Sequence, residues 1–383
     1  MPAGRPTSPN AIARARAVGQ SIWLDFISRD ILRNGELRRL VDLGVSGVTS
    51  NPTIFEKSIS AGSLYDADLL ALARRGSSAM EIYEALALKD IADAADVLRP
   101  VYDAADGADG FVSIEVNPEL ARDTAATIAE ARRLSRSLGR PNVLIKVPAT
   151  PEGIPAIRTL IGDGVSVNVT LIFSLGAYRS VANAYIDGLN DRARSGTRDL
   201  SRISSVASFF VSRVDTLVDK QLDSVRGERA ARAATLKGTI AIANAKLAYH
   251  EFKRLFEGSS FGALKRLGAR PQRTLWASTS TKNPSYVDTM YLDGLMGPNT
   301  VNTLPPATLE AFLDHGKVAN VIGEGAGLAG EQIDSLKELG ISYDAATAEL
   351  LEAGVKAFAD SFKSLLANID RKRAGLLTAP AGR

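Results

Sequence analysis

The sequence is 383 residues long, with 46 Lys plus Arg, 43 Asp plus Glu and 45% hydrophobic residues. The formal net charge is only +3, so the composition does not indicate nucleic-acid binding, which requires a clustered basic surface. The chain has no Cys and only two His, His250 and His315. This composition excludes disulfides, thiolate nucleophiles and Cys-ligated metals, and it argues against a His-built metal site or a Ser-His-Asp triad.

The ends of the chain give no sign of membrane insertion or secretion. No segment approaches the ~20 consecutive apolar residues of a transmembrane helix. Residues 1–18 hold several Arg, Pro and Ala but no acidic residue, and they lack the apolar core of a secretory signal. We therefore expect a cytoplasmic protein that is not attached to a membrane, with residues 1–18 as a flexible N-terminal extension and 371–383 as a C-terminal tail.

Short apolar, β-branched segments alternate with longer amphipathic ones along the chain. The expected strands are residues 21–27, 47–51, 111–116, 142–148, 166–172, 205–211, 274–279 and 300–305. At about 150 residues per domain the length would also allow two or three domains. Eight strands alternating with helices instead predict an α/β fold, a single (β/α)8 TIM barrel over residues 19–370. Additional helices are expected as insertions near 55–108 and 212–270, and over about 320–370 as a cover for the barrel.

Polar residues interrupt these otherwise apolar strands near their carboxyl ends. A parallel strand covered on both faces should be nearly all apolar. The exceptions are Asp25, Asn51, Glu115, Lys146, Asn168, Thr170 and Ser208. In a (β/α)8 barrel the carboxyl ends of the strands build the active site. We therefore expect these side chains to meet at one barrel mouth.

Each of these residues also has a structural interpretation when taken alone. Lys146 could extend to solvent at an exposed edge. Asp25 and Glu115 could cap a helix or pair with an Arg. Asn and Thr at strand ends are frequent turn formers, and Ser208 alone is nearly uninformative. Four ionisable or amide groups at successive strand ends nevertheless favour a common site.

A lysine among Val, Leu, Ile and Pro indicates Schiff-base chemistry. Burial disfavours the charged ammonium of Lys146 and leaves an amine that can attack a ketone carbon. The resulting Schiff base is an electron sink that permits cleavage of the neighbouring C–C bond. Asp25 and Glu115 are the carboxylates available to move protons. Nothing in the sequence calls for a metal or a cofactor, and no Gly-rich phosphate cup supports a pyridoxal phosphate enzyme.

Several long motifs resemble the transaldolase family from about residue 20 to about residue 365. They are TSNPTIFEKSI (49–59), SIEVNPELARDT (113–124), NVLIKVPATPEGIPAI (142–157), VNVTLIFSLGAY (167–178), SFFVSRVD (208–215) and NTVNTLPPATLEAF (299–312). The long helical insertion and the WASTSTKNPSY stretch are similar to the bacterial branch with longer chains. The resemblance implies transfer of dihydroxyacetone from sedoheptulose 7-phosphate or fructose 6-phosphate to an aldose phosphate such as glyceraldehyde 3-phosphate, in the non-oxidative pentose phosphate pathway.

The resemblance also implies a catalytic role for four residues. Lys146 matches the family's Schiff-base lysine. Asp25 matches the aspartate that takes the proton from the C4 hydroxyl during cleavage and returns it in the reverse step. Glu115 and Thr170 match the pair that holds the water used to relay protons while the carbinolamine forms and dehydrates.

The remaining matched residues are implied to bind the sugar phosphate. Asn51 and Asn168 would bind the dihydroxyacetone hydroxyls, Ser208 would line the same pocket, and Arg213 matches the phosphate-binding arginine. Where many transaldolases carry a second such arginine, in Ala-Ser-Phe-Arg-Asn, this chain has ASTSTKNP with Lys282. A lysine binds phosphate as a point charge without the bidentate fork of arginine, and an ordinary loop lysine is the alternative.

Two rival functions remain at this stage. A simple aldolase would release free dihydroxyacetone, but such relatives are shorter and carry Gln and Tyr where this chain has Glu115 and Phe210. A non-catalytic sugar-phosphate-binding barrel could lose Lys146 or its proton relay, whereas this sequence retains every member. The sequence leaves the oligomeric state open between a monomer and a homodimer.

Overall fold

A computed structural model of the chain describes residues 9–378, and its centre is a closed barrel of eight parallel strands. Neighbouring strands pair in chain order from β1 to β8, and β8 pairs with β1. The strands are β1 (Gln20–Leu24), β2 (Gly47–Thr49), β3 (Phe111–Glu115), β4 (Val143–Pro148), β5 (Val167–Ile172), β6 (Ser205–Phe210), β7 (Arg273–Ala277) and β8 (Thr300–Leu304). The predicted (β/α)8 barrel is thus confirmed, and all eight expected strands are present.

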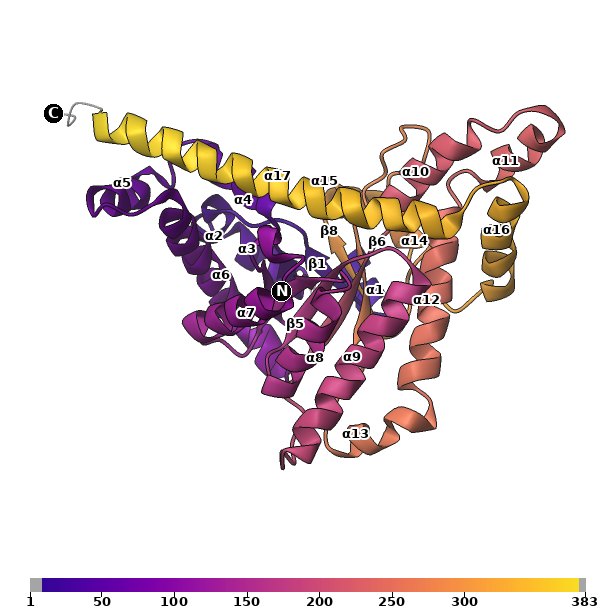
Figure 1. Cartoon of the computed structure of the whole chain (residues 1–383), viewed down its shortest axis with the longest axis horizontal. Helices are drawn as coiled ribbons and strands as arrows, with labels where there is room; N and C mark the ends of the chain where they lie inside the picture. Colours follow the sequence, from indigo (N-terminus) through magenta and orange to yellow (C-terminus); the bar gives the residue numbers. More distant parts are fainter. Residues whose placement is uncertain (1–8, 379–383) are drawn as a thin grey trace, which may run out of the picture.

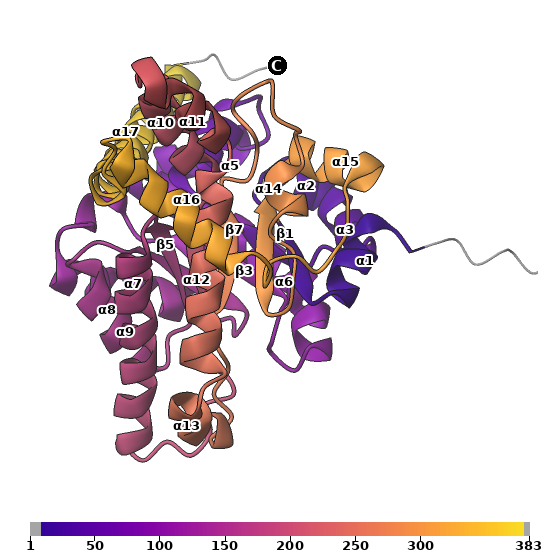
Figure 2. The same cartoon turned by 90° about the vertical axis from the view of Figure 1, so that its right-hand side faces the viewer.

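Helices surround the barrel and extend beyond it (Figures 1 and 2). The first half of the chain contains α1 (Ala11–Ala17), α2 (Arg29–Arg33), α3 (Glu36–Asp42), α4 (Pro52–Ser60), α5 (Asp66–Arg74), α6 (Ala79–Ala104), the 3-10 helix η1 (Pro118–Leu120), α7 (Thr124–Leu138), α8 (Gly153–Asp163) and α9 (Leu175–Arg194). The second half contains α10 (Ser212–Leu222), η2 (Gly227–Arg229), α11 (Ala230–Leu236), α12 (Ile240–Phe256), η3 (Ser259–Phe261), α13 (Gly262–Arg266), α14 (Met290–Asp293), α15 (Pro306–His315), α16 (Ala326–Glu338) and α17 (Tyr343–Thr378). The segments expected as insertions therefore hold α4 to α6 and α10 to α13.

The N-terminal extension predicted for residues 1–18 is wrong for its second half. Asn10 caps α1 by accepting a hydrogen bond from the Ala13 amide at 2.8 Å, and its side-chain amide donates to the Leu43 carbonyl at 2.9 Å. Ile12 and Ala15 are buried against the barrel. The Arg-rich composition concealed a narrow apolar face that tertiary packing stabilises. Residues 1–8 lie outside the described part of the chain.

The C-terminal tail predicted for residues 371–383 is also wrong as far as Thr378. Helix α17 is 36 residues long and lies across one end of the barrel (Figure 1). Near its end, Lys372 Nζ donates to the Gly62 carbonyl at 2.7 Å and Arg373 Nη1 to the Ser77 carbonyl at 2.9 Å. These contacts to distant loops, rather than local sequence, hold the last turns in place. Residues 379–383 lie outside the described range.

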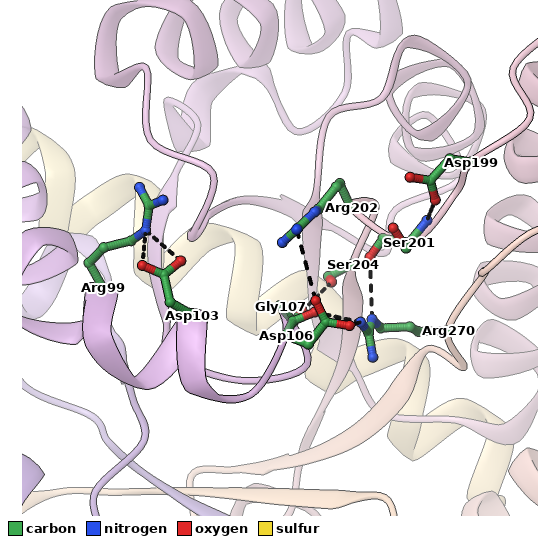
Figure 3. A network of polar contacts seen from close by, with 9 residues as sticks. All are labelled: Arg99, Asp103, Asp106, Gly107, Asp199, Ser201, Arg202, Ser204 and Arg270. Atoms are coloured by element: carbon green, nitrogen blue, oxygen red, sulfur yellow. Dashed lines mark hydrogen bonds and ion pairs between the residues drawn. The ribbon is translucent and has the colours of Figure 1, made fainter.

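A polar network joins the loops at the amino-terminal end of the barrel (Figure 3). Arg270 donates to the Asp106 carbonyl at 2.5 Å and to the Ser201 carbonyl at 3.3 Å, and Ser204 Oγ donates to the Gly107 carbonyl at 3.3 Å. Asp106 is 82% exposed, so its ion pairs are screened by water and add little to stability. The network connects loops at the end of the barrel where strands begin, which in this fold usually contributes stability rather than catalysis.

Inside the barrel, a large aromatic side chain occupies the space left by a glycine. Trp23 of β1 is fully buried, and its indole N–H donates to Asp109 at 2.8 Å. A Cβ placed on Gly47 of β2 would lie 2.6 Å from Cγ of Trp23, far inside van der Waals contact. Gly47 is therefore required by the close approach of the indole ring.

We predict that Gly47→Ala destabilises the protein by about 1–3 kcal/mol, because the indole must move in a fully packed core. Urea denaturation of the parent and variant measures the change in the free energy of unfolding. Gly330→Ala, in α16, is the control, because nothing lies within 4 Å of its added Cβ. That control should be neutral or stabilising by up to ~1 kcal/mol. Equal unfolding midpoints for Gly47→Ala and the parent would contradict the packing argument.

Candidate active site

A cavity of about 460 Å³ opens at the carboxyl ends of the strands, under α17. Eight of the nine residues predicted from the sequence line it: Asp25, Asn51, Lys146, Asn168, Thr170, Ser208, Arg213 and Lys282. Glu115 is the ninth, and it does not belong to the cavity wall. Side chains that are widely separated in sequence thus meet at the barrel mouth, as the strand-end argument predicted.

Lys146 lies on β4 with its amine inside the barrel. The side chain is 6% exposed, so it does not extend to an outer edge. Nζ donates a hydrogen bond to the Ser50 carbonyl at 2.9 Å and lies 3.4 Å from Oε2 of Glu115. The Ser50 carbonyl is itself oriented by its own residue, whose hydroxyl donates to the Ser113 carbonyl at 2.7 Å. The amine is therefore held at a defined point beneath the cavity.

Glu115 lies beside the amine but is turned away from the cavity. Strand pairing places it directly opposite Lys146 in the sheet register. Burial raises the pKa of its carboxyl, while the nearby Lys146 charge lowers the pKa and Asp25 raises it. Oε2 accepts no hydrogen bond within the described residues. A carboxyl in this environment can accept a proton from the amine while remaining out of the path of a ligand.

Asp25 follows β1 at the floor of the cavity. Its Oδ1 accepts a hydrogen bond from the Thr49 hydroxyl at 2.6 Å, and that hydroxyl also lies 2.6 Å from Oγ1 of Thr303. Burial raises the pKa of Asp25, and the Thr49 bond and the Lys146 charge lower it. No Arg pairs with Asp25 within residues 9–378, and α2 is capped by Ser28 instead. The carboxylate is therefore directed at the site rather than used to hold the fold.

Asn168 links three strands across the barrel interior. Its amide N–H donates to Oγ of Ser113 at 3.0 Å, and its carbonyl oxygen accepts from Oγ of Ser208 at 2.7 Å. Thr170, two residues further along the same face of β5, is fully buried, and its hydroxyl has no hydrogen-bond partner in the described chain. Asn168 is thus fixed in orientation, while the Thr170 hydroxyl is available at the cavity wall.

Asn51 both caps a helix and lines the cavity, so the two interpretations offered by the sequence hold together. Its side-chain oxygen caps α4 by accepting from the Ile54 amide at 3.0 Å. The residue also lines the cavity. Because capping occupies the oxygen, the group left to face a ligand is the amide N–H donor pair.

Three cations lie on the outer wall of the cavity. Arg213, at the start of α10, has its guanidinium carbon 5.1 Å from the ring centre of Phe210 and 6.0 Å from that of Phe358. Burial lowers the pKa of Arg213. Burial and the charges of Arg213 and Lys57 lower the pKa of Lys282. None of the three cations forms a salt bridge with an acid in the described part of the chain, so this wall is prepared for an anion.

Comparison with known proteins identifies the family of this chain. A family model described as transaldolase/fructose-6-phosphate aldolase matches residues 22–369. The chain belongs to this family. It is 48% identical over 372 residues to a protein named transaldolase 2 from Nostoc sp. (strain PCC 7120 / SAG 25.82 / UTEX 2576), covering 95% of this chain and 97% of the relative. It is 50% identical over 362 residues to a transaldolase from Acidothermus cellulolyticus, covering 94% and 96% of the two chains.

Some residues of this transaldolase-family site were missed by the sequence reasoning. Lys57 lines the cavity together with Ile54 and Asn51, which precede it by three and six residues. This helical spacing along α4 places Lys57 on the same side as Asn51 and could have identified it from the sequence. Phe358 reaches the site from α17, with its ring centre 5.9 Å from Lys146 Nζ. No local pattern identifies that contact, because it depends on how a helix more than 200 residues away in sequence crosses the barrel.

The described chain lacks two features, a membrane-spanning helix and a cluster of metal ligands. No helix in residues 9–378 is both long enough and apolar enough to cross a membrane. Within that range, no three His, Cys, Asp or Glu side chains are grouped so that they could hold a metal ion.

We predict that dialysis against EDTA leaves the thermal unfolding midpoint unchanged. The physical reason is that the polar groups of the site are bonded to one another or face the cavity, without a ligand set. Differential scanning fluorimetry measures the midpoint. A lower midpoint after dialysis, restored by adding a divalent cation, would contradict this prediction.

Proposed function

We propose that this protein is a transaldolase. It would take a dihydroxyacetone unit from sedoheptulose 7-phosphate or fructose 6-phosphate and transfer it to an aldose phosphate such as glyceraldehyde 3-phosphate, in the non-oxidative pentose phosphate pathway. The observation that carries the proposal is the buried amine of Lys146, held between a carbonyl and a carboxyl at one end of a cavity whose outer wall is cationic. A cytoplasmic location and a monomeric or homodimeric state stay predictions from the sequence.

The reaction begins with attack of the Lys146 amine on the C2 carbonyl of the ketose. Glu115, whose raised pKa makes it a competent proton acceptor, takes a proton from the amine and returns one as the carbinolamine loses water. The Thr170 hydroxyl lines the cavity together with Lys146 and would hold the water that relays these protons. The product is a protonated Schiff base joining C2 to Nζ.

Cleavage then depends on Asp25. Its carboxylate removes the proton from the C4 hydroxyl, the C3–C4 bond breaks, and the electron pair moves into the Schiff base to give an enamine. The aldose phosphate leaves with C4 as its new aldehyde carbon. In the second half, C3 of the enamine attacks the aldehyde of the acceptor, Asp25 returns its proton, and hydrolysis frees Lys146.

The polar wall orients the three-carbon unit during both halves. Asn51 presents amide N–H donors, and Asn168 is held by Ser113 and Ser208 so that it can bind a hydroxyl of the dihydroxyacetone. Arg213 and Lys282 would bind the phosphate, and Lys57 adds a third cation to the same wall. A free aldehyde would be retained less well than a phosphorylated one, which favours transfer between sugar phosphates.

We predict that fructose 6-phosphate followed by borohydride leaves a reduced dihydroxyacetone group on Lys146 alone. Peptide mapping by mass spectrometry locates the mark. Lys146→Met should fold, take no mark and lose transfer activity by several orders of magnitude, because the covalent route is gone. Lys89→Met, which removes an exposed lysine paired with Asp93 on α6, is the matched control and should behave like the parent. Substantial transfer by Lys146→Met would disprove the Schiff-base mechanism.

An acceptor distinguishes transfer from simple release. With fructose 6-phosphate and erythrose 4-phosphate, a transaldolase forms sedoheptulose 7-phosphate, whereas an aldolase accumulates free dihydroxyacetone at a rate that does not depend on the acceptor. Glu115 and Phe210 favour transfer, since the simple aldolases of the family differ at the matching positions. Acceptor-independent release as the main reaction would replace the proposed activity with the aldolase one.

We predict that Asp25→Asn still forms the Schiff base but cleaves it poorly, because the amide cannot take the C4 hydroxyl proton. Borohydride should then trap the intact six-carbon phosphate on Lys146 instead of the three-carbon group. Thr49→Val is the control, because it removes the hydrogen bond to Asp25 but keeps the carboxylate, and it should yield the three-carbon mark. If Asp25→Asn forms no adduct at all, Asp25 serves binding rather than cleavage.

A further inference from the structure

The loop between β7 and α14, residues 278–289 and hereafter the β7 loop, carries part of the outer cavity wall. Ser278, Ser280 and Lys282 of this loop line the cavity. Within the described chain, Lys282 is held only by a bond inside its own loop, from Nζ to Oγ of Ser280 at 2.7 Å. The place of the Lys282 charge therefore depends on what holds the β7 loop itself.

Helix α10, which begins beside Arg213, holds this loop at two points. At the inner point, the Ser212 amide donates to the Ser278 carbonyl at 3.0 Å. At the outer point, Tyr286 of the loop and Tyr291 of α14, which directly follows the loop, donate to two carboxylates one helical turn apart. We call these four residues the carboxylate–tyrosine clamp: Tyr291 to Asp215 at 2.9 Å and Tyr286 to Asp219 at 2.6 Å. The same helix thus carries one cation of the wall and fixes the loop that carries another.

The carboxylates of the clamp also bind the start of α12 and the turn before it. Asp215 accepts from the Ala241 amide at 2.7 Å, and Asp219 accepts from the Gly238 amide at 3.0 Å. Gly238 has φ +69°, and a Cβ there would lie 2.8 Å from Cζ of Tyr286. The tyrosine ring therefore packs directly on the backbone of this turn, and the clamp joins three segments that are separated in sequence.

The clamp contains a buried acid that the proposed reaction does not use. Asp215 is 1% exposed, and no Lys or Arg pairs with it in residues 9–378. Burial, aided by the nearby Asp219, raises the pKa of Asp215 to about 7. Burying a carboxyl without a cation costs free energy, which hydrogen bonds to the carboxyl offset. Packing alone would be better served by an apolar side chain, so the bonds that Asp215 and Asp219 accept indicate a positioning role.

The clamp acts against the charge repulsion between Lys282 and its two neighbouring cations. Arg213 and Lys57 both act on Lys282 in the direction expected for like charges. A loop free to move would carry Lys282 away from Arg213 into solvent, where the repulsion is screened. Holding the cations together before the ligand arrives preorganises the anion site, so binding does not have to order the loop.

We propose that the carboxylate–tyrosine clamp consists of positioning residues that keep the β7 loop against α10 and hold Lys282 beside Arg213. This inference rests on the proposed function, because it assigns the two cations to the substrate phosphate. None of the four clamp residues lines the cavity, and none is bonded to Lys146 in the described chain. Its loss therefore affects recognition of the phosphate and leaves the Schiff-base chemistry intact.

Tyr286→Phe tests the clamp by removing one hydroxyl and nothing else. Hydrogen–deuterium exchange should become faster in residues 278–289 but stay unchanged in the barrel strands. Tyr185→Phe is the matched control, because it removes a tyrosine hydroxyl bonded to the Arg270 carbonyl at 2.8 Å, at the other end of the barrel. Unchanged exchange of the β7 loop in Tyr286→Phe would overturn the clamp whatever the protein catalyses.

Kinetics test the link to the phosphate. With glyceraldehyde 3-phosphate as acceptor, Tyr286→Phe should raise KM by roughly three- to tenfold with little change in kcat, as expected for a weakened charge-assisted contact. With unphosphorylated glyceraldehyde, KM should not change. An equal rise in KM for both acceptors would show a general disturbance of the site and overturn the assignment to the phosphate.

A double-mutant cycle tests whether the clamp acts through Lys282. Lys282→Ala alone should raise KM for the phosphorylated acceptor, and adding Tyr286→Phe to it should cause little further change. Additive effects of the two substitutions would overturn the proposed link. If the parent protein neither transfers dihydroxyacetone nor takes a mark on Lys146, the proposed function fails, and the exchange experiment still decides whether the clamp holds the loop.

Discussion

The pairing register of three neighbouring strands places the reactive groups of this protein side by side. In the sheet, Glu115 of β3 stands opposite Lys146 of β4, which stands opposite Asn168 of β5. Because the eight strands close into a barrel, this row faces the interior. A shift of one residue in any of the three strands would turn that strand's polar group to the outside. The remainder of the site, including the Ser50 carbonyl at the amine, is built around this row.

The cavity separates two kinds of electrostatic environment. At its inner end, burial raises the pKa values of Asp25 and Glu115, and the Lys146 charge opposes that rise for both. At its outer wall, positive charges stand without acidic partners in the described chain and influence one another instead. A ligand with a carbonyl at one end and a phosphate at the other has a single favourable orientation in such a field. The same charges that bind the phosphate therefore direct the carbonyl to the amine.

The sequence was sufficient to predict the barrel, its eight strands and eight of the polar or charged side chains that line the cavity. This was possible because a polar residue in a doubly covered strand is unfavourable unless it has a use, so each exception marked the site. The orientation of Glu115 away from the cavity was not predictable, since a strand end shows which face a residue occupies but not where a flexible side chain points. The extents of α1 and α17 were missed for a related reason: contacts to distant loops, not local composition, order those segments.

Because this chain has a lysine where many relatives have an arginine at the outer wall, the orientation of this cation depends more on the surrounding structure. An arginine fork fixes the geometry of a phosphate through two parallel hydrogen bonds, whereas a lysine is a point charge on a flexible stem. With Lys282, the direction of the contact must come from the loop that carries it. Asp215 is bonded to Tyr291 of α14 and to the start of α12, and the half-buried Asp219 is bonded to Tyr286 of the loop and to Gly238 of the turn before α12. These bonds supply that rigidity from outside the site. Buried acids thus lie at both ends of the cavity: Asp25 and Glu115 beside the amine, and Asp215 behind the cationic wall, where it positions the neighbouring segments.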